Sequence, residues 1–459
     1  MSILIILLAL GFLMYVAYRG LSVILFAPVA AVLAVLLTNP AWVPAFFSGI
    51  FMERMVIFVK LYFPVFLLGA IFGKFIEVSG FARSIIGAVT GFVGLRHAIL
   101  AVVAVCAILT YGGVSLFVVA FAVYPFAAEL FRAANVPKRL IPATIGLGAA
   151  TFTMDALPGS PQIQNIIPTT FFGTDAWAAP WLGLSGGIFV FAMGMAFLEW
   201  RRRSAEHAGE GYGEGHSNEP VSHWTGALPH PALAIAPLLL VGVLNKLLTQ
   251  WIPAFYGKTV NLADGSRVEV DKLTAIWAVE GALLAAILLV VVVSFPRIRA
   301  GFAVGTQSAV NGAVLAALNT GSEYGFGAVI AALPGFAAIQ AVVAGSVRDP
   351  LINVAVTTTL LAGITGSASG GMSIALGAMG QTYLQNALAA GISPEVLHRV
   401  AAMASGGMDT LPHNGAVISM LMVTGLTHRQ SYGDILGLTA IKTMAAFLVI
   451  GLYYWFGVQ

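Results

Sequence analysis

The sequence predicts an all-α polytopic membrane protein with two inverted-topology repeats, each containing a re-entrant helical hairpin and a broken transmembrane helix. Three observations predict this fold class. The 459 residues are 59% hydrophobic and only 9% charged, whereas roughly 25% of the residues of an average soluble domain are charged. Apolar segments approaching the ~20 residues that a spanning helix needs recur along the whole chain. The same unusual motifs appear once in each half.

The 51 glycines and 21 prolines fall largely inside the apolar segments. In a bilayer such residues mark places where helices pack closely or are interrupted. Met1–Val16 lacks the basic region and the cleavage site of a signal peptide, so we expect it to form the first spanning helix. Cys106 is the only cysteine and therefore cannot form an intrachain disulfide.

The distribution of charge predicts topology and not a nucleic-acid surface. The net charge is +3, and the cations are scattered at the ends of apolar segments, so we expect no nucleic-acid partner. Basic residues beside a span stay in the cytoplasm, and the run Arg201 to Arg203 therefore makes residues 201–230 a cytoplasmic linker. This linker separates a first repeat, 1–200, from a second, 231–459.

The opening helical pair of each half is expected to have opposite orientation. Arg19 lies in the connection of the first pair, which the same rule places inside. The corresponding loop of the second half, Thr249–Lys272, is placed outside by Arg297 and Arg299 further along the chain. An inverted repeat requires this opposition.

The later part of each half carries the same motifs in the same order. Gly112-Gly113-Val114-Ser115 precedes Pro137 and Met154-Asp155-Ala156-Leu157-Pro158, and Gly370-Gly371-Met372-Ser373 precedes Pro394 and Met408-Asp409-Thr410-Leu411-Pro412. The spacing is nearly constant, which indicates an internal repeat. We expect hairpins at about 97–132 and 350–389 with the glycine pair at each tip, broken helices at about 139–172 and 394–427, and closing helices at about 180–198 and 435–456.

Two carboxylates, Asp155 and Asp409, lie inside apolar segments. An ionisable group at that depth costs at least ~2.5–3.5 kcal/mol, so each must have a compensating role. One interpretation is that each binds a proton, a cation or a polar substrate where its helix unwinds. The alternative is that each caps the helix that resumes after the break. The two roles are compatible.

The hairpin tips are candidates for binding an anion without a basic side chain. Helix N-termini and exposed backbone amides attract carboxylates, and Thr110, Ser367 and Ser369 stand just ahead of the glycine pairs. The alternative is that the glycines are packing contacts between membrane helices.

The two breaks differ in chemistry. The first is rich in hydroxyl and amide groups, including Thr153, and predicts the substrate side. The second has His413, whose imidazole titrates near neutral pH, and predicts the proton side, although a lone histidine at a helix end can also be a cap. The expected substrate-binding residues are Thr110, Gly112, Gly113, Ser115, Thr153, Asp155, Ser160, Gln162, Asn165, Ser367, Ser369, Gly370, Gly371, Ser373 and Asn414, and the expected proton- or ion-coupling residues are Asp155, Asp409 and His413.

The paired hairpins and breaks resemble the gluconate permease family of proton symporters, within the ion-transporter superfamily, over nearly the whole chain. The segments Leu109–Phe121, Ile141-Pro142-Ala143-Thr144 and Thr151–Asn165 are similar to a branch labelled as hydroxybutyrate permease. Gluconate carriers proper have a His- and Pro-rich first break, whereas this chain has Met154-Asp155-Ala156-Leu157-Pro158-Gly159. This departure makes a short hydroxy acid at least as good a candidate as gluconate.

The resemblance implies uptake of a small carboxylate, gluconate or a hydroxy acid such as 3-hydroxybutyrate, by proton symport, with sodium as the other possible coupling ion. It further implies elevator-type alternating access, a homodimer and a multi-pass location in a bacterial inner (plasma) membrane. A cation/proton antiporter of the same superfamily is the alternative. No phosphate-binding loop, metal-ligand spacing or nucleophile elbow is present, and Asp409 lacks the Gly-x-Gly-Asp context of intramembrane aspartyl proteases, so we expect neither an enzyme nor a cofactor.

Overall fold

A computed structural model describes residues 2–459 except 20, 95–96, 115, 217–218, 220–227, 337, 339–348 and 413. Almost every described segment that has regular structure is helical, and the described part of the chain contains one small sheet, the antiparallel pair β1 (Thr259–Asn261) and β2 (Arg267–Glu269). Within these described residues, six helices are long and apolar enough to cross a membrane. The prediction of an all-α polytopic membrane protein is confirmed.

The first half contains the elements α1 (Ser2–Tyr18), α2 (Val23–Thr38), η1 (Pro40–Trp42), α3 (Val43–Ala45), η2 (Phe46–Met52), α4 (Glu53–Val78), α5 (Phe81–Val93), α6 (Ala98–Tyr111), α7 (Leu116–Ala133), η4 (Lys138–Leu140), α8 (Ile141–Ala149), α9 (Phe152–Asp155), α10 (Ile163–Phe172) and α11 (Pro180–His207). The second half contains α12 (Pro231–Tyr256), α13 (Val270–Val293), α14 (Phe295–Ala332), α16 (Pro350–Thr365), α17 (Ala368–Ala389), α18 (Pro394–Ser405), α19 (Gly415–Thr424) and α20 (His428–Phe456).

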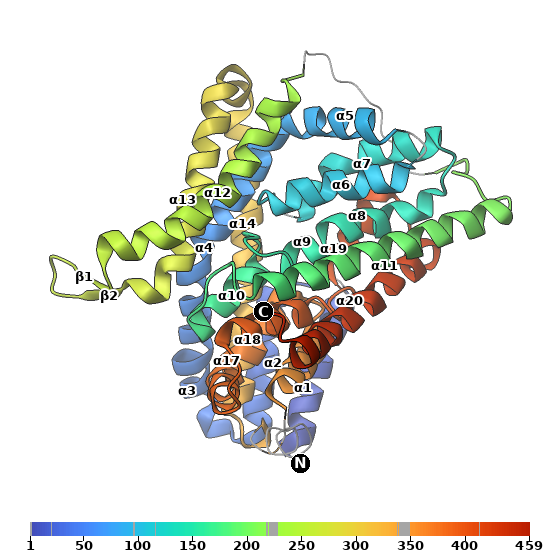
Figure 1. Cartoon of the computed structure of the whole chain (residues 1–459). Coiled ribbons are helices and arrows are strands. Elements are labelled where there is room, and N and C mark those ends of the chain that lie inside the picture. Colours follow the sequence, from blue (N-terminus) through green and yellow to red (C-terminus); the bar gives the residue numbers. More distant parts are fainter. Residues whose placement is uncertain are drawn as a thin grey trace.

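The long helices α4 and α14, one from each half, pack along each other on one side of the molecule (Figure 1). Glycines on α14 allow the close approach: a side chain at Gly325 would meet the backbone of Phe51, and one at Gly321 would meet Val59 and Met55. Around this pair lie α2, α12 and α13, while α8 and the closing helices α11 and α20 lie on the other side (Figure 1).

Contacts between the halves come in pairs with exchanged roles. Helix α2 of the first half packs on α14 of the second, and α13 of the second half packs on α4 of the first. In the same way, the contact between α1 and α16 has its counterpart in that between α12 and α6. The contact between α19 and α7 has its counterpart in that between α10 and α17. The helices α4 and α14, and likewise α11 and α20, contact their own expected counterparts. A two-fold relation between halves produces this pattern. The division into inverted repeats, with re-entrant hairpins, stays a prediction that these exchanged contacts favour.

The two expected hairpins have different turns. Helices α6 and α7 are joined through Gly112 and Gly113, and Gly113 has a positive φ of 98°. Helices α16 and α17 are joined instead at Gly366 and Ser367, where Gly366 has a φ of 65°. Gly370 and Gly371 therefore lie in the first turn of α17 and not in the turn itself, which differs from the sequence-based expectation. A side chain at Gly371 would overlap the backbone of Ala362 on α16.

Each expected broken helix is interrupted where the Met-Asp motif stands. The first consists of α8, the short α9 and α10, and the second of α18 and α19. The closing helices are longer than expected, because α11 continues to His207 and α20 begins at His428. The first residues of the expected linker are therefore helical.

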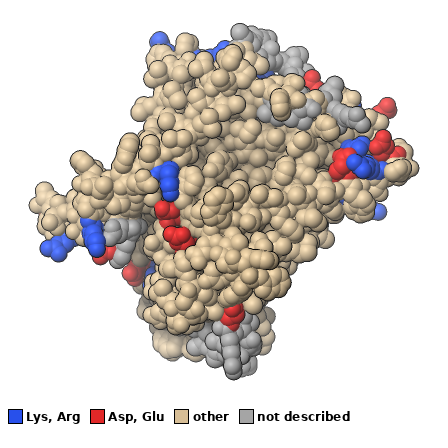
Figure 2. Space-filling model, viewed as in Figure 1, with Lys and Arg blue, Asp and Glu red and all other residues tan. Residues whose placement is uncertain are grey.

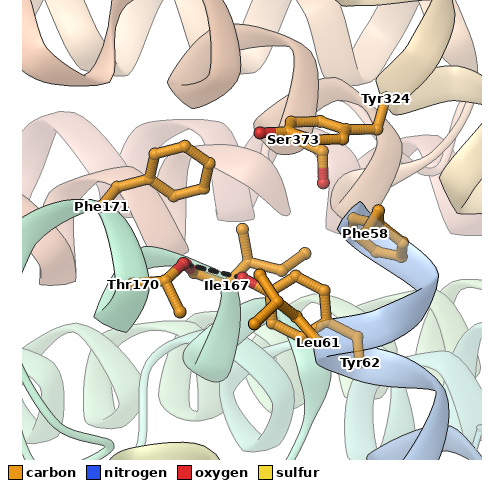
Figure 3. A pocket seen from close by; sticks show the side chains of 8 residues that line it. All are labelled: Phe58, Leu61, Tyr62, Ile167, Thr170, Phe171, Tyr324 and Ser373. Atoms are coloured by element: carbon orange, nitrogen blue, oxygen red, sulfur yellow. Dashed lines mark hydrogen bonds between the residues drawn. The ribbon is translucent and has the colours of Figure 1, made fainter. Parts of the chain in front are cut away.

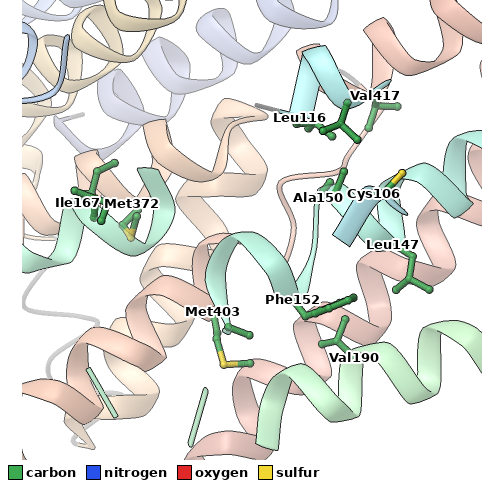
Figure 4. Close-up of a cluster of buried hydrophobic side chains, with 14 of the residues drawn as sticks. Cys106, Leu116, Leu147, Ala150, Phe152, Ile167, Val190, Met372, Met403 and Val417 are labelled. Atoms are coloured by element: carbon green, nitrogen blue, oxygen red, sulfur yellow. The ribbon is translucent and has the colours of Figure 1, made fainter. Parts of the chain in front are cut away.

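The outer surface in Figure 2 is largely uncharged, and its acidic and basic side chains gather in a few places. Large apolar side chains such as Leu36, Leu239 and Val292 are exposed, which is the arrangement that a lipid solvent favours. The interior is a continuous apolar cluster drawn from both halves. Figure 4 shows part of it around the breaks, where Ala150 and Phe152 from the first half lie in the same region as Met403 and Val417 from the second.

Replacing Gly371 by alanine tests the close packing of the second hairpin. The added methyl group has no space against the α16 backbone, so we expect the Gly371→Ala variant to be destabilised by roughly 1–3 kcal/mol, as is typical of overpacking. Thermal unfolding in detergent measures this change. Gly433→Ala on α20 is the matched control, because its methyl group meets nothing within 4 Å and alanine stabilises a helix by up to about 1 kcal/mol relative to glycine. Equal unfolding temperatures for the two variants would contradict the packing.

Candidate functional site

The two breaks meet at a buried cluster of opposite charges. Lys442, on α20, lies with its Nζ 3.1 Å from Oδ1 of Asp409 and 3.8 Å from Oδ2 of Asp155. All three side chains are buried. Asp155 ends α9, and Asp409 lies in the irregular segment between α18 and α19. We call these three residues the charge cluster.

The backbone around the charge cluster is shaped to bring the charges together. Lys442 Nζ donates a hydrogen bond of 2.8 Å to the carbonyl of Ala150, the residue that caps the C-terminus of α8. A cation is stabilised at a helix C-terminus by the unpaired carbonyls there. Gly406 is also required, because a side chain at that position would overlap the Asp155 carboxylate and the end of Lys442.

The charges of the cluster do not balance when every group is ionised. Two carboxylates share one ammonium group, and the buried guanidinium group of Arg399 is a further positive charge that attracts Asp155 from outside the cluster. An uncompensated charge in such an interior costs several kcal/mol. Removal of Lys442 would leave both carboxylates without the ion pair. Binding of one proton by either carboxylate would make the cluster neutral.

The capping interpretation fails for the helices that resume after the breaks. The N-cap of α10 is Gln162, and the N-cap of α19 is Asn414, whose Oδ1 accepts hydrogen bonds from the amides of Ala416 and Val417. Neither Asp155 nor Asp409 occupies those positions. Their placement in the charge cluster therefore needs another explanation.

The polar side chains of the first break donate mainly to backbone carbonyls of the protein itself. Thr153 Oγ1 donates to the carbonyl of Gly148, and Ser160 Oγ donates to that of Thr153. Asn165 Nδ2 donates to the carbonyls of Ser160 and Ala176. Gln162 Nε2 donates, at 2.7 Å, to the carbonyl of Thr110 at the first hairpin tip. Four of the expected substrate-binding side chains therefore stabilise the unwound segment by bonding to the protein itself.

Asn414 holds the second hairpin in the same way that Gln162 holds the first. Its Nδ2 donates, at 2.7 Å, to the carbonyl of Gly366 in the turn between α16 and α17. In each half an amide side chain beyond the Pro of the break thus ties that break to its own hairpin tip. Ser367 caps α17, because its Oγ accepts a hydrogen bond from the amide of Gly370. The Oγ atoms of Ser367 and Ser369 are 3.4 Å apart.

Arg399, on α18, is a functional candidate that the sequence analysis missed. It is completely buried, and its guanidinium group donates to Asn165 Oδ1 and to the carbonyls of Asp155 and Ala178. An arginine of the second half therefore fixes the first break, next to the carboxylate of the charge cluster. Its neighbour His398 is also buried and lies within hydrogen-bonding distance of Thr174 and Asn165.

Lys442 was missed as well, although a signal for it exists in the sequence. It is the only charged residue between Ile435 and Phe456, and a lone ionisable residue within an apolar spanning segment is a functional candidate on that ground alone. Arg399 had a weaker signal, because its place near Pro394 made it look like a charge flanking the hairpin.

Two expected site residues have hydroxyls without a hydrogen-bond partner in the described part of the chain, Thr110 and Ser373. Ser373 lines a cavity of about 160 Å³ between α4 and α14 on one side and α10 and α17 on the other. Figure 3 shows its lining residues: Phe58, Leu61, Tyr62, Ile167, Thr170, Phe171, Tyr324 and Ser373. Tyr62 and Thr170 are joined by a hydrogen bond of 2.8 Å.

The expected site residues therefore fall into separate groups. Asp155 and Asp409 come together on Lys442, although the sequence analysis assigned them to different sides. Gly112 and Gly113 pack against Leu238 and Leu283 of the outer helices, Gly370 and Gly371 lie in α17, and Ser373 faces the cavity. Ser115 and His413 lie outside the described residues.

The chain is similar to known transporters. It is 56% identical over 466 residues, 99% of both chains, to the "Uncharacterized transporter YxjC" of Bacillus subtilis (strain 168). No protein-family model matches the chain. Weaker structural similarity links it to the YdaH transporter of Alcanivorax borkumensis, with a TM-score of 0.49, 16% identity and 88% coverage of each chain. MtrF of Neisseria gonorrhoeae, whose structure is described as illuminating a class of antimetabolite efflux pumps, gives a TM-score of 0.48 and 13% identity over 88% of this chain and 83% of that one.

Replacing Lys442 by methionine tests the charge cluster. The Lys442→Met variant leaves two buried carboxylates without their ammonium partner, so we expect a loss of about 3–5 kcal/mol of stability, as for other broken buried ion pairs. Thermal unfolding in detergent measures the loss. Combining Lys442→Met with Asp409→Asn removes a charge of each sign and is expected to restore most of the stability. Lys246→Met, at an exposed lysine of α12, is the control. An equally small effect of both lysine substitutions would contradict the cluster.

Proposed function

The chain belongs to the family of the Bacillus subtilis transporter YxjC and is a membrane transporter, and we propose that it takes up a small organic anion by proton symport. The anion is gluconate or a short hydroxy acid such as 3-hydroxybutyrate, and the chain stands in the hydroxybutyrate-permease-like branch of the gluconate permease family. Transport follows an elevator-type movement of the hairpins and broken helices past the outer helices, in a homodimer in the bacterial inner membrane.

The charge cluster is the observation that carries the proposal. Two carboxylates share one ammonium, so the cluster can gain one proton without losing its ion pair. Asp409 is the closer of the two to Lys442, at 3.1 Å against 3.8 Å for Asp155. Asp155 is therefore the better candidate to take the proton, with Asp409 held on the lysine. Both breaks would respond to that single proton, because the cluster joins them.

The cavity of about 160 Å³ is the candidate substrate site. The hydroxyls of Tyr62, Thr170, Tyr324 and Ser373 can bond to a carboxylate and a hydroxyl group. The cavity also lies between the outer helices α4 and α14 and the elements α10 and α17. In an elevator movement α10 and α17 would slide past the outer helices and carry a substrate bound in this cavity with them.

A cation/proton antiporter is the second candidate, and two observations favour it. No charged side chain is among the residues that line the cavity. The amide and hydroxyl groups of the first break, which were expected to bind an anion, bond to the protein itself. Under this alternative the charge cluster would bind ions only.

Uptake into proteoliposomes tests the proposal. We expect labelled 3-hydroxybutyrate to accumulate when the outside is acidic, and more strongly than gluconate, because the first break, Met154-Asp155-Ala156-Leu157-Pro158-Gly159, departs from that of the gluconate carriers. Ser373→Ala removes a cavity-lining hydroxyl that has no hydrogen-bond partner among the described residues and is expected to lower uptake at least tenfold, on the order of the 1.4 kcal/mol that one factor of ten represents. Ser185→Ala on α11, away from the cavity, is the matched control. Uptake that does not respond to the pH gradient would contradict proton symport. No accumulation of any carboxylate, together with proton-driven cation exchange, would favour the antiporter.

A further inference from the structure

A buried carboxyl group outside the charge cluster lies at the tip of the second hairpin. Glu323, on α14, is 5% exposed, and its side chain is hydrogen-bonded to Ser367 in the turn between α16 and α17. The second oxygen, Oε2, has no hydrogen-bond partner among the described groups. This carboxyl connects one of the outer helices to the hairpin.

The hairpin tip is built around this carboxyl group. A side chain at Gly370 would overlap Glu323 Oε2 and also approach Ser367 Oγ. Glycine at position 370 therefore makes the space that the carboxyl occupies. The next residue of α14, Tyr324, and Ser373 of α17 face the same cavity (Figure 3), so the contact between α14 and the hairpin borders the candidate substrate site.

The elements around Glu323 supply little charge that could compensate a carboxylate. The elements η2, α2 and α17, which pack on α14, carry no charged residue, and neither does α16. On α4, Arg54 lies beside the Tyr324 hydroxyl, and it is itself exposed. The remaining charged residues on the elements packed against α14 are Glu53, Lys60, Lys74 and Glu77 on α4 and Asp271, Lys272 and Glu280 on α13.

A carboxylate without a compensating charge is strongly disfavoured in a membrane interior. A proton or a bound metal cation could neutralise it. Cations such as Ca²⁺ and Mg²⁺ take six or more oxygen ligands, whereas among the described residues Ser367 is the one polar side chain bonded to Glu323. The described residues also contain no group of three or more His, Cys, Asp or Glu side chains that could hold a metal ion. The surroundings fit a proton.

We propose that Glu323 is a proton-binding site separate from the charge cluster, and that its proton holds the tip of the second hairpin against α14. The protonated carboxyl group is neutral and can stay in the apolar contact. Loss of the proton places a charge where Oε2 has no donor, and hydration of that charge requires the hairpin tip to separate from α14. The link to transport depends on the proposed function, because the hairpin is the part expected to move.

The infrared band of protonated carboxyl groups tests the site directly. The purified protein at neutral pH is expected to show carboxylic-acid C=O absorption that the Glu323→Gln variant lacks. Glu280→Gln, at a partly exposed carboxyl of α13, is the matched control and should retain the band. An identical band in wild type and Glu323→Gln would overturn the proposal. Adding sodium chloride should leave the band unchanged, and its loss on addition of sodium would assign the site to a metal cation and also overturn it.

Hydrogen–deuterium exchange tests the link to the hairpin. In wild type, exchange of peptides that cover residues 360–375 should rise at the pH at which the band disappears, whereas in Glu323→Gln it should stay low at all pH values. The same pH-dependent rise in both would show that another group controls the tip. Neither measurement uses a substrate, so a failed uptake assay would count against the proposed function and leave this test of Glu323 intact.

Discussion

The pairing of Lys442 with Asp155 and Asp409 is the interaction on which the rest of the site depends. Ionised groups are tolerated inside a membrane protein only when they are paired and bonded. One lysine on α20 satisfies this condition for both breaks and for the end of α8. The breaks can therefore stay unwound without either carboxylate being left alone. A change in the charge of the cluster would alter the electrostatic energy of both breaks at once.

The surrounding structure holds this arrangement in place from both halves. Arg399 of the second half bonds to the first break, and Gln162 and Asn414 tie each break to its own hairpin tip. Glycines such as Gly406 remove the side chains that would keep the segments apart. The outer pair α4 and α14 is continuous and lacks breaks. This contrast between interrupted and continuous helices is the physical basis for the proposed movement of one part past the other.

The sequence was sufficient for the fold class and for the positions of most helices, because apolar length, glycine and proline act locally. It also led to Asp155 and Asp409, since charge in an apolar segment is conspicuous. Their convergence on Lys442 depends on contacts between distant segments, which a repeat motif does not reveal. The same limit applies to Glu323, whose partner Ser367 comes from another helix. The turn at Gly366 was missed because Gly370-Gly371 was aligned with Gly112-Gly113. In the structure Gly371 allows close packing against α16, and Gly370 leaves space for Glu323.

The number of protons that enter with each substrate molecule tests the role of the charge cluster most directly. A pH-sensitive dye inside proteoliposomes and labelled 3-hydroxybutyrate would give the ratio. We predict that Asp155→Asn, which keeps the shape of the side chain and removes its titration, moves substrate down its own gradient with fewer protons than wild type. An unchanged proton-to-substrate ratio in both Asp155→Asn and Asp409→Asn would contradict it.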